Sequence, residues 1–148
     1  MVDPSVALFG PLDTLVAPYI EFVLLALVLL NFVSRRVAHG RHVRQAEDGD
    51  DADAVSRHPF HSFTTWGLVL ASFYYLTLHH HSGMVLGTLV LVTYIADLFE
   101  FEARKVEARE GLDLEAPKGA LVAAAFTFLY VGYLSVFFLI EPLWTQVI

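Results

Sequence analysis

Four long apolar segments, separated by polar stretches, dominate the chain. They cover residues of about 15–34, 63–79, 83–99 and 119–140, and each is nearly free of charged side chains. A bilayer with a hydrocarbon core of about 30 Å is crossed by roughly 20 apolar residues of α-helix. The second and third segments are slightly short, and we expect their flanking residues to extend them. The pattern therefore predicts four membrane-spanning helices.

The positively charged residues indicate how these helices are oriented. Residues 35–62 carry five arginines, and residues 100–118 carry two arginines and two lysines, which together account for all nine cations of the chain. Lys and Arg concentrate in cytoplasmic loops of membrane proteins. We therefore predict one all-α domain over residues 1–148, an integral four-helix bundle of the cell membrane. Loops 35–62 and 100–118 are cytoplasmic, and both termini are extracellular.

Composition supports the membrane class. Hydrophobic residues make up 56% of the 148 residues and aromatic residues 14%, which is more apolar surface than most soluble domains of this length bury. The first 34 residues contain no Lys or Arg, so they lack the positive start of a secretory signal, and we expect the first apolar segment to remain as an anchor. The acidic stretch 47–53 predicts a solvated, mobile loop. Cysteine is absent, which excludes a thiolate metal site.

Two carboxylates, Glu21 and Asp97, lie inside the predicted helices. Ionisable groups within a membrane are costly, so each is a candidate for a proton or ion path in a small transporter. The two residues are predicted to lie at opposite depths, so they cannot form one paired site. In the structural interpretation, which we favour, Glu21 reaches the outer interface or a neighbouring helix. Asp97 then pairs with Arg104 or with a basic residue of a loop.

Two histidine pairs flank the first cytoplasmic loop: His39 with His42, and His58 with His61. Neutral imidazoles bind zinc, copper and haem iron, so the four are candidate ligands of an electron-transfer cofactor. A residue that disfavours helix interrupts each pair, a glycine in the first and a proline in the second, and no carboxylate is fixed beside them. We favour histidines that hydrogen-bond lipid headgroups or a partner protein, and we expect no cofactor and no metal.

A third histidine group, His79-His80-His81, lies between the second and third apolar segments. Adjacent side chains on a helix point about 100° apart, so three in a row cannot converge on one ion. We predict a tight outer turn that joins two antiparallel helices. Gly83 and Gly87 follow it with the GxxxG spacing that lets helices approach closely in lipid.

Enzyme motifs are missing from the sequence: it has no phosphate-binding loop, no HExxH and no cysteine-based site. We therefore expect a non-catalytic protein, with the lipid bilayer and other membrane subunits as partners and no nucleic acid. The favoured role is an accessory or assembly subunit of a larger membrane complex. A histidine-ligated haem or metal electron-transfer protein and a small proton or ion transporter remain the alternatives.

Two blocks of the sequence carry a resemblance to a known group of proteins. YIADLFEFEARKVEAREGLDLEAPKGA, which includes Asp97 to Gly119, and TLVAPYIEFVLLALVLLNF near the N-terminus resemble a haloarchaeal family of small multi-span membrane proteins of unknown function. Members of that family are associated with cytochrome bc-type respiratory complexes. The resemblance implies an accessory role beside such a complex, and it carries over no catalytic or ligand residue.

Overall fold

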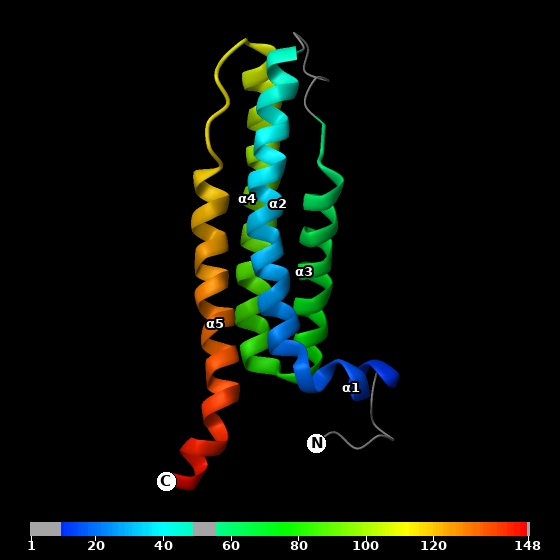
Figure 1. The fold of residues 1–148 in the computed structure, drawn as a ribbon, viewed down its shortest axis with the longest axis vertical. Helices are drawn as coiled ribbons and strands as arrows, with labels where there is room; N and C mark the ends of the chain where they lie inside the picture. Colours follow the sequence, from blue (N-terminus) through cyan, green and yellow to red (C-terminus); the bar gives the residue numbers. More distant parts are fainter. Residues whose placement is uncertain (1–9, 49–55, 148) are drawn as a thin grey trace.

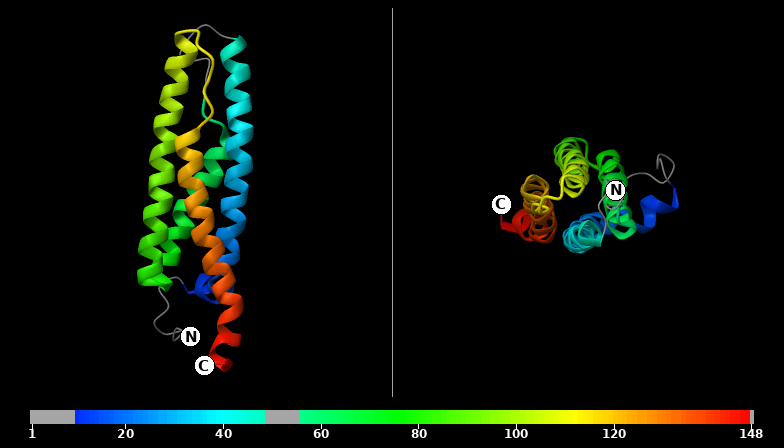
Figure 2. Two further views of the ribbon diagram at one scale, coloured as in Figure 1. Left: turned by 90° about the vertical axis from the view of Figure 1, so that its left-hand side faces the viewer. Right: turned by 90° about the horizontal axis from the view of Figure 1, so that it is seen from above.

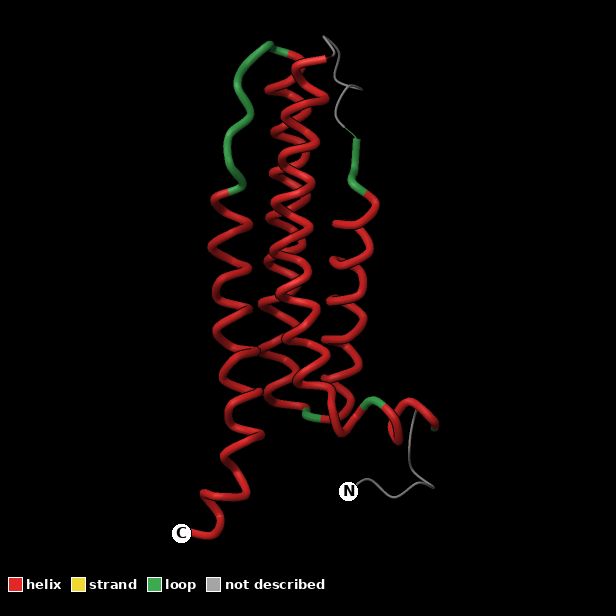
Figure 3. Tube along the Cα trace, viewed as in Figure 1, coloured by secondary structure: helices red, strands yellow, loops and turns green. Residues whose placement is uncertain are grey.

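The computed structural model describes residues 10–48 and 56–147, and in these ranges the chain is helical with no strand. Figure 1 shows the elements in space, and Figure 3 shows that loops are confined to short connections. The elements are α1 (Pro11–Leu15), the 3₁₀ helix η2 (Ala17–Tyr19), α2 (Ile20–Asp48), α3 (Pro59–Leu78), α4 (His80–Arg109) and α5 (Lys118–Val147). The all-α prediction is confirmed.

The four long helices form an up-and-down bundle. Each of α2, α3, α4 and α5 contacts the next, and α5 closes the ring against α2. The view along the bundle in Figure 2 shows the four helices around a common axis. The short α1 lies across one end of the bundle, and this is the end at which α5 terminates and α3 turns into α4 (Figure 1).

Two hydrophobic cores of unequal size hold the helices together. The larger core lies in the bundle and includes the fully buried Leu24, Leu86 and Val131, contributed by α2, α4 and α5. The smaller core lies where α2 and α4 continue past the first turns of α3 and α5. It is built on Phe101 and Ala108, with a few half-buried neighbours. The second core shows that the polar ends of α2 and α4 pack on each other.

Three helical segments are long and apolar enough to cross a membrane: Ala17–Glu47, His80–Arg109 and Lys118–Phe137. Only about a third or less of each apolar window is buried inside the molecule, at 33%, 28% and 33%, so most of the apolar surface faces outward. The fourth predicted span corresponds to α3, whose Thr, Ser, Tyr and His side chains lower its hydropathy. The four-span count therefore stays a prediction.

Several predicted boundaries were wrong because helices continue through polar residues. The basic stretch after residue 34 was expected to be loop, yet α2 continues to Asp48. Gly40 lies inside α2, because most of its neighbours are good helix formers and one face packs on α4. Pro142 lies inside α5 and not after it. The predicted acidic loop falls mostly on residues 49–55, outside the described residues.

The turn between α3 and α4 is as tight as predicted. His79 alone separates the two helices; its N–H donates to the Tyr75 carbonyl at 2.9 Å, and its own carbonyl accepts from Gly83 N at 2.8 Å. A Cβ on Gly83 would overlap the backbone of Leu76, so this glycine permits the close approach of α3 and α4. A Cβ on Gly87 would meet nothing within 4 Å, so only the first glycine of the GxxxG pair has that role.

Candidate functional site

A buried ion pair joins α2 to α4 within the bundle. The Arg35 guanidinium donates from Nε to Asp97 Oδ1 at 3.0 Å and from Nη2 to Oδ2 at 2.7 Å. Arg35 is 2% exposed, and its Nη2 also donates to Asn31 Oδ1 at 2.8 Å. Such a two-point contact between guanidinium and carboxylate is both strong and directional. Of the two partners predicted for Asp97, Arg104 was wrong, because it lies about two turns further along α4. The alternative, a basic residue of the predicted loop 35–62, is confirmed in Arg35, which the structure places in α2.

Polar side chains of α3 complete a network around this ion pair. His61 Nε2 lies 3.5 Å from Asp97 Oδ2, and its Nδ1 lies 2.9 Å from Ser34 Oγ. Ser34 Oγ is in turn 2.8 Å from Thr64 Oγ1, to which Asn31 Nδ2 also donates at 3.1 Å. Buried polar groups are stable when their hydrogen bonds are made inside the protein. The network therefore links α2, α3 and α4 to one another. It also gives the charge of Asp97 a structural role as the partner of Arg35 and His61.

The other carboxylate that the sequence placed inside a predicted span lies at the opposite end of the bundle. Glu21 is 7% exposed, and its Oε1 is 3.9 Å from His79 Nε2 in the α3–α4 turn. Its backbone carbonyl accepts a hydrogen bond from Ser135 Oγ of α5 at 3.3 Å. Glu21 and Asp97 thus lie near opposite ends of the bundle, and the prediction that they do not form one site is confirmed.

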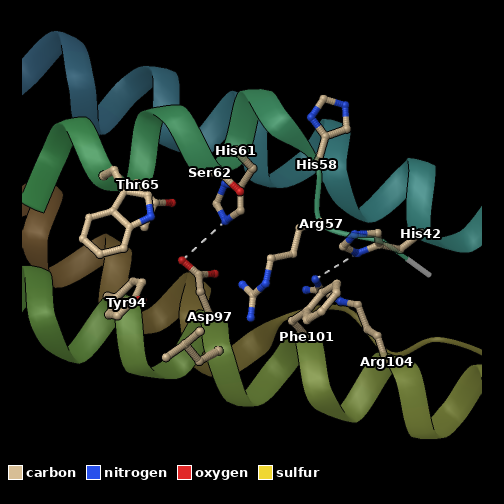
Figure 4. Close-up of a pocket in the computed structure, with 12 residues that line it drawn as sticks. His42, Arg57, His58, His61, Ser62, Thr65, Tyr94, Asp97, Phe101 and Arg104 are labelled. Carbon is tan, nitrogen blue, oxygen red and sulfur yellow. Dashed lines mark hydrogen bonds and ion pairs between the residues drawn. The ribbon is translucent and has the colours of Figure 1, made fainter. Parts of the chain in front are cut away.

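A pocket of about 340 Å³ opens beside the ion pair, between α3 and α4 (Figure 4). One part of its wall is aromatic and includes Trp66 and Tyr94, whose ring centroids are 5.6 Å apart, and Phe101. Leu98 adds to this apolar part, and the rest of the wall is polar. It contains the side chains of His42, Arg57, His58, His61, Ser62, Thr65, Asp97 and Arg104. The pocket therefore has an apolar region and a cationic region.

Arg104 is the most deeply placed cation of the pocket wall. It is 6% exposed, and its Nη1 donates to His42 Nδ1 at 3.2 Å, while His42 Nε2 is 2.9 Å from the Ser56 carbonyl. Because a guanidinium can only donate, His42 is the neutral tautomer that carries its proton on Nε2. Arg104 Nε and Nη2 are buried without a hydrogen-bond partner, and Arg104 forms no ion pair within residues 10–48 and 56–147.

A second cation, Arg57, reaches the pocket from the segment that precedes α3. Its guanidinium carbon lies 4.5 Å from the centroid of the Phe101 ring, a cation–π contact. The next residue, His58, caps α3 by accepting a hydrogen bond from Phe60 N on Nδ1 at 3.2 Å. Partial burial and the charge of Arg41 lower the pKa of His58, which keeps this nitrogen free of a proton at neutral pH.

The structure brings together some of the histidines singled out in the sequence. His42, His58 and His61 line the pocket, whereas His39 does not. Within the described part of the chain, no group of three or more His, Cys, Asp or Glu side chains is placed to hold a metal ion. The four candidates thus do not form a shared ligand set. His80 and His81 are exposed on the first turn of α4 and do not converge with His79.

Sequence reasoning missed Arg35 and the residues of α2 and α3 that surround it. A signal was present, because Asn31, Ser34 and Arg35 have the i, i+3, i+4 spacing of one helical face at the end of an apolar segment. His61 and Thr64 repeat that spacing on the facing helix. Polar residues on one face of a membrane helix indicate contact with a partner helix.

The fold and the site together define a class: an all-α bundle with helices suited to a membrane, and with a charged network and a pocket between them. One family matches the chain over residues 3–148, the Domain of unknown function (DUF7313), and the chain belongs to this family. No curated protein and no solved structure is significantly similar to the chain. The predicted resemblance to an uncharacterised family is therefore confirmed at that level.

Proposed function

We propose that this protein is a non-catalytic, multi-pass protein of the cell membrane and an accessory or assembly subunit of a larger membrane complex. The observation that carries the proposal is the end of α5. Residues 136–147, here called the α5 overhang, continue past the other helices of the bundle (Figure 1). An apolar helix end that the described residues of its own chain leave uncovered is a natural contact for another protein.

The α5 overhang begins where the packing of α5 ends. Ser135, 4% exposed, contacts the start of α2 through its hydrogen bond to the Glu21 carbonyl. Beyond it, every described side chain of α5 is exposed, including Leu139 at 59%, Leu143 at 62% and Trp144 at 59%. At 1.5 Å per residue, the overhang extends about 18 Å past Ser135.

Helix length supports the idea that this overhang leaves the bilayer. The 20 residues of α3 span about 30 Å, the thickness of a hydrocarbon core, whereas the 30 residues of α5 span about 45 Å. The excess of α5 lies at the end of the bundle where α3 turns into α4. Burying one exposed leucine or tryptophan stabilises an association by about 1.5–3 kcal/mol, so a partner that covers the overhang gains considerable affinity.

The direction of the helices supports four spans with both termini outside. Both α2 and α4 begin at the same end of the bundle, so α3 must return the chain across the membrane if they span it. Arg35 and all other Lys and Arg residues lie toward the opposite end, which the positive-inside rule assigns to the cytoplasm. The α3–α4 turn, α1 and the α5 overhang are then extracellular.

The identity of the complex rests on the sequence resemblance alone. The block from Asp97 to Gly119 resembles a haloarchaeal family associated with cytochrome bc-type complexes, so we propose a respiratory complex as the assembly. The buried network supports a non-catalytic role, because both oxygens of Asp97 are engaged by Arg35. Lipid and other membrane subunits are then the partners, and nucleic acid is not.

Purification of the tagged full chain from its native membrane in mild detergent tests the proposal. We expect stoichiometric membrane proteins to co-purify, and we expect the double variant Leu143→Ala/Trp144→Ala to lose them. Leu129→Ala is the matched control, because Leu129 is 65% exposed on α5 but lies within the bundle. Recovery of a lone monomer or homodimer contradicts the accessory role. Full retention of the partners by the double variant contradicts the role of the α5 overhang.

A further inference from the structure

We propose that the pocket between α3 and α4 binds the phosphate group of an anionic molecule. The proposal is independent of the α5 overhang, which lies at the other end of the bundle. It rests on the net charge of the pocket wall and on the arrangement of its side chains, which Figure 4 shows. Neither the family match nor the sequence motifs assign a ligand to this pocket.

The charged groups of the pocket wall favour an anionic ligand. Two guanidinium groups, those of Arg104 and Arg57, contribute to the wall, and one carboxylate does, that of Asp97. The carboxylate is already neutralised by the buried Arg35 at 2.7 Å. The pocket wall therefore keeps a net positive charge of about two, which favours an anion.

Arg104 is the group best placed to bind that anion, because its charge is buried and two of its hydrogen-bond donors have no partner. Arg104 is only 6% exposed, and its single hydrogen bond goes to the neutral ring of His42. Glu100, Asp97 and Glu107 favour the charged form of Arg104 through space, but none of them forms an ion pair with it. A bound anion would supply the direct contact that this buried charge lacks. Guanidinium groups match the geometry of phosphate oxygens particularly well.

The order of side chains along the pocket indicates what is attached to the phosphate. Arg104 and His42 lie at the end toward the polar continuations of α2 and α4, whereas Tyr94 lies further into the bundle (Figure 4). The ring of Trp66 lies beside that of Tyr94, with 5.6 Å between their centroids. Trp66 is 53% exposed, so this aromatic end borders the apolar outer surface of the bundle. A phospholipid has the same polarity, with the phosphate at the interface and an apolar chain below it.

Native mass spectrometry of the full chain in detergent tests the site. The probes are phosphatidylglycerol and, as the control lipid with the same acyl chains but no phosphate group, diacylglycerol. We expect a one-to-one adduct with phosphatidylglycerol and about tenfold weaker binding by Arg104→Gln and by Arg57→Gln, the usual effect of losing one charge-assisted hydrogen bond. Arg109→Gln is the matched control, because Arg109 is exposed on the same helix and removes the same charge.

Competition with inorganic phosphate distinguishes a water-soluble phosphate compound from a phospholipid as the ligand. Displacement of the lipid by millimolar inorganic phosphate, with the same dependence on Arg57, supports a water-soluble phosphate compound as the ligand. Resistance to displacement supports a phospholipid. The Arg57 variant keeps the test valid if Arg104→Gln fails to fold, because Arg57 lies outside the helices. Equal binding of both lipids, or equal effects of Arg57→Gln and Arg109→Gln, overturns the proposal.

Discussion

Replacing Asp97 by asparagine should destabilise the bundle strongly. The substitution keeps the size of the side chain but removes the charge that Arg35 contacts through two hydrogen bonds, at 3.0 Å and 2.7 Å. Arg35 is 2% exposed, so its guanidinium remains buried without a counter-charge. Removing one partner of a buried ion pair costs about 3–5 kcal/mol of unfolding free energy.

The double substitution Arg35→Met/Asp97→Leu tests the cause of that loss. It removes both charges together and leaves two apolar side chains of similar size. Such replacements are often neutral or even stabilising, because neither charge then pays for desolvation. We expect the double variant to recover most of the stability lost by Asp97→Asn, with a remaining cost of about 1 kcal/mol for the unpaired Asn31 Oδ1.

The unfolding free energy is measured in mixed micelles by titration with a denaturing detergent, monitored by the circular dichroism of the helices. Arg36→Gln is the matched control, since Arg36 is exposed beside Arg35 and should change stability by less than about 0.5 kcal/mol. The reasoning is refuted if Asp97→Asn costs no more than Arg36→Gln. It is also refuted if the double variant is less stable than the single one.

Glycine substitutions give three further predictions for the same unfolding assay. Gly83→Ala should lower the free energy of unfolding by about 1–3 kcal/mol, because the new methyl group meets the backbone of Leu76. Gly87→Ala should be neutral or stabilising, because its methyl group meets no atom within 4 Å. Equal effects of the two variants would contradict the close approach of α3 and α4. Gly111→Ala should cost about 1–2 kcal/mol, because φ is +71° there, and an unchanged stability would argue against that turn. Gly40→Ala, in open space within α2, should stabilise by about 0.5–1 kcal/mol.

The long apolar helices and the tight turn were predictable because their signals are local. Hydrophobic length defined three of the helices directly, and the polar group His79-His80-His81 between two apolar segments identified the turn. The end of α4 at Arg109 has a local signal as well, because Gly111 follows two residues later with the positive φ that terminates a helix. The continuation of α2 to Asp48 was missed, because hydropathy marks the end of an apolar segment and not the end of a helix.

The site was less predictable because it depends on which residues face each other across helices. The sequence identified Asp97 and His61 separately, but Arg35, which contacts Asp97 through two hydrogen bonds, was counted only as a loop cation. The rotation of α2 that turns Arg35 inward and Arg36 outward is set by packing against α3 and α4. The pocket also requires Arg57 to fold back over Phe101, a contact across 44 positions of the chain that no local pattern reports.

The small second core has a consequence for local stability. Phe101 and Ala108 bury little apolar surface compared with the bundle core, so the paired ends of α2 and α4 are held by few contacts. Segments of this kind open on their own at a lower free energy than the whole domain, and their amide hydrogens exchange with solvent sooner. His42 and Arg104 lie in this pair of helix ends. The cationic wall of the pocket thus belongs to a part of the molecule that opens more readily than the bundle core, and an anion bound there would slow amide exchange at this end of the bundle first.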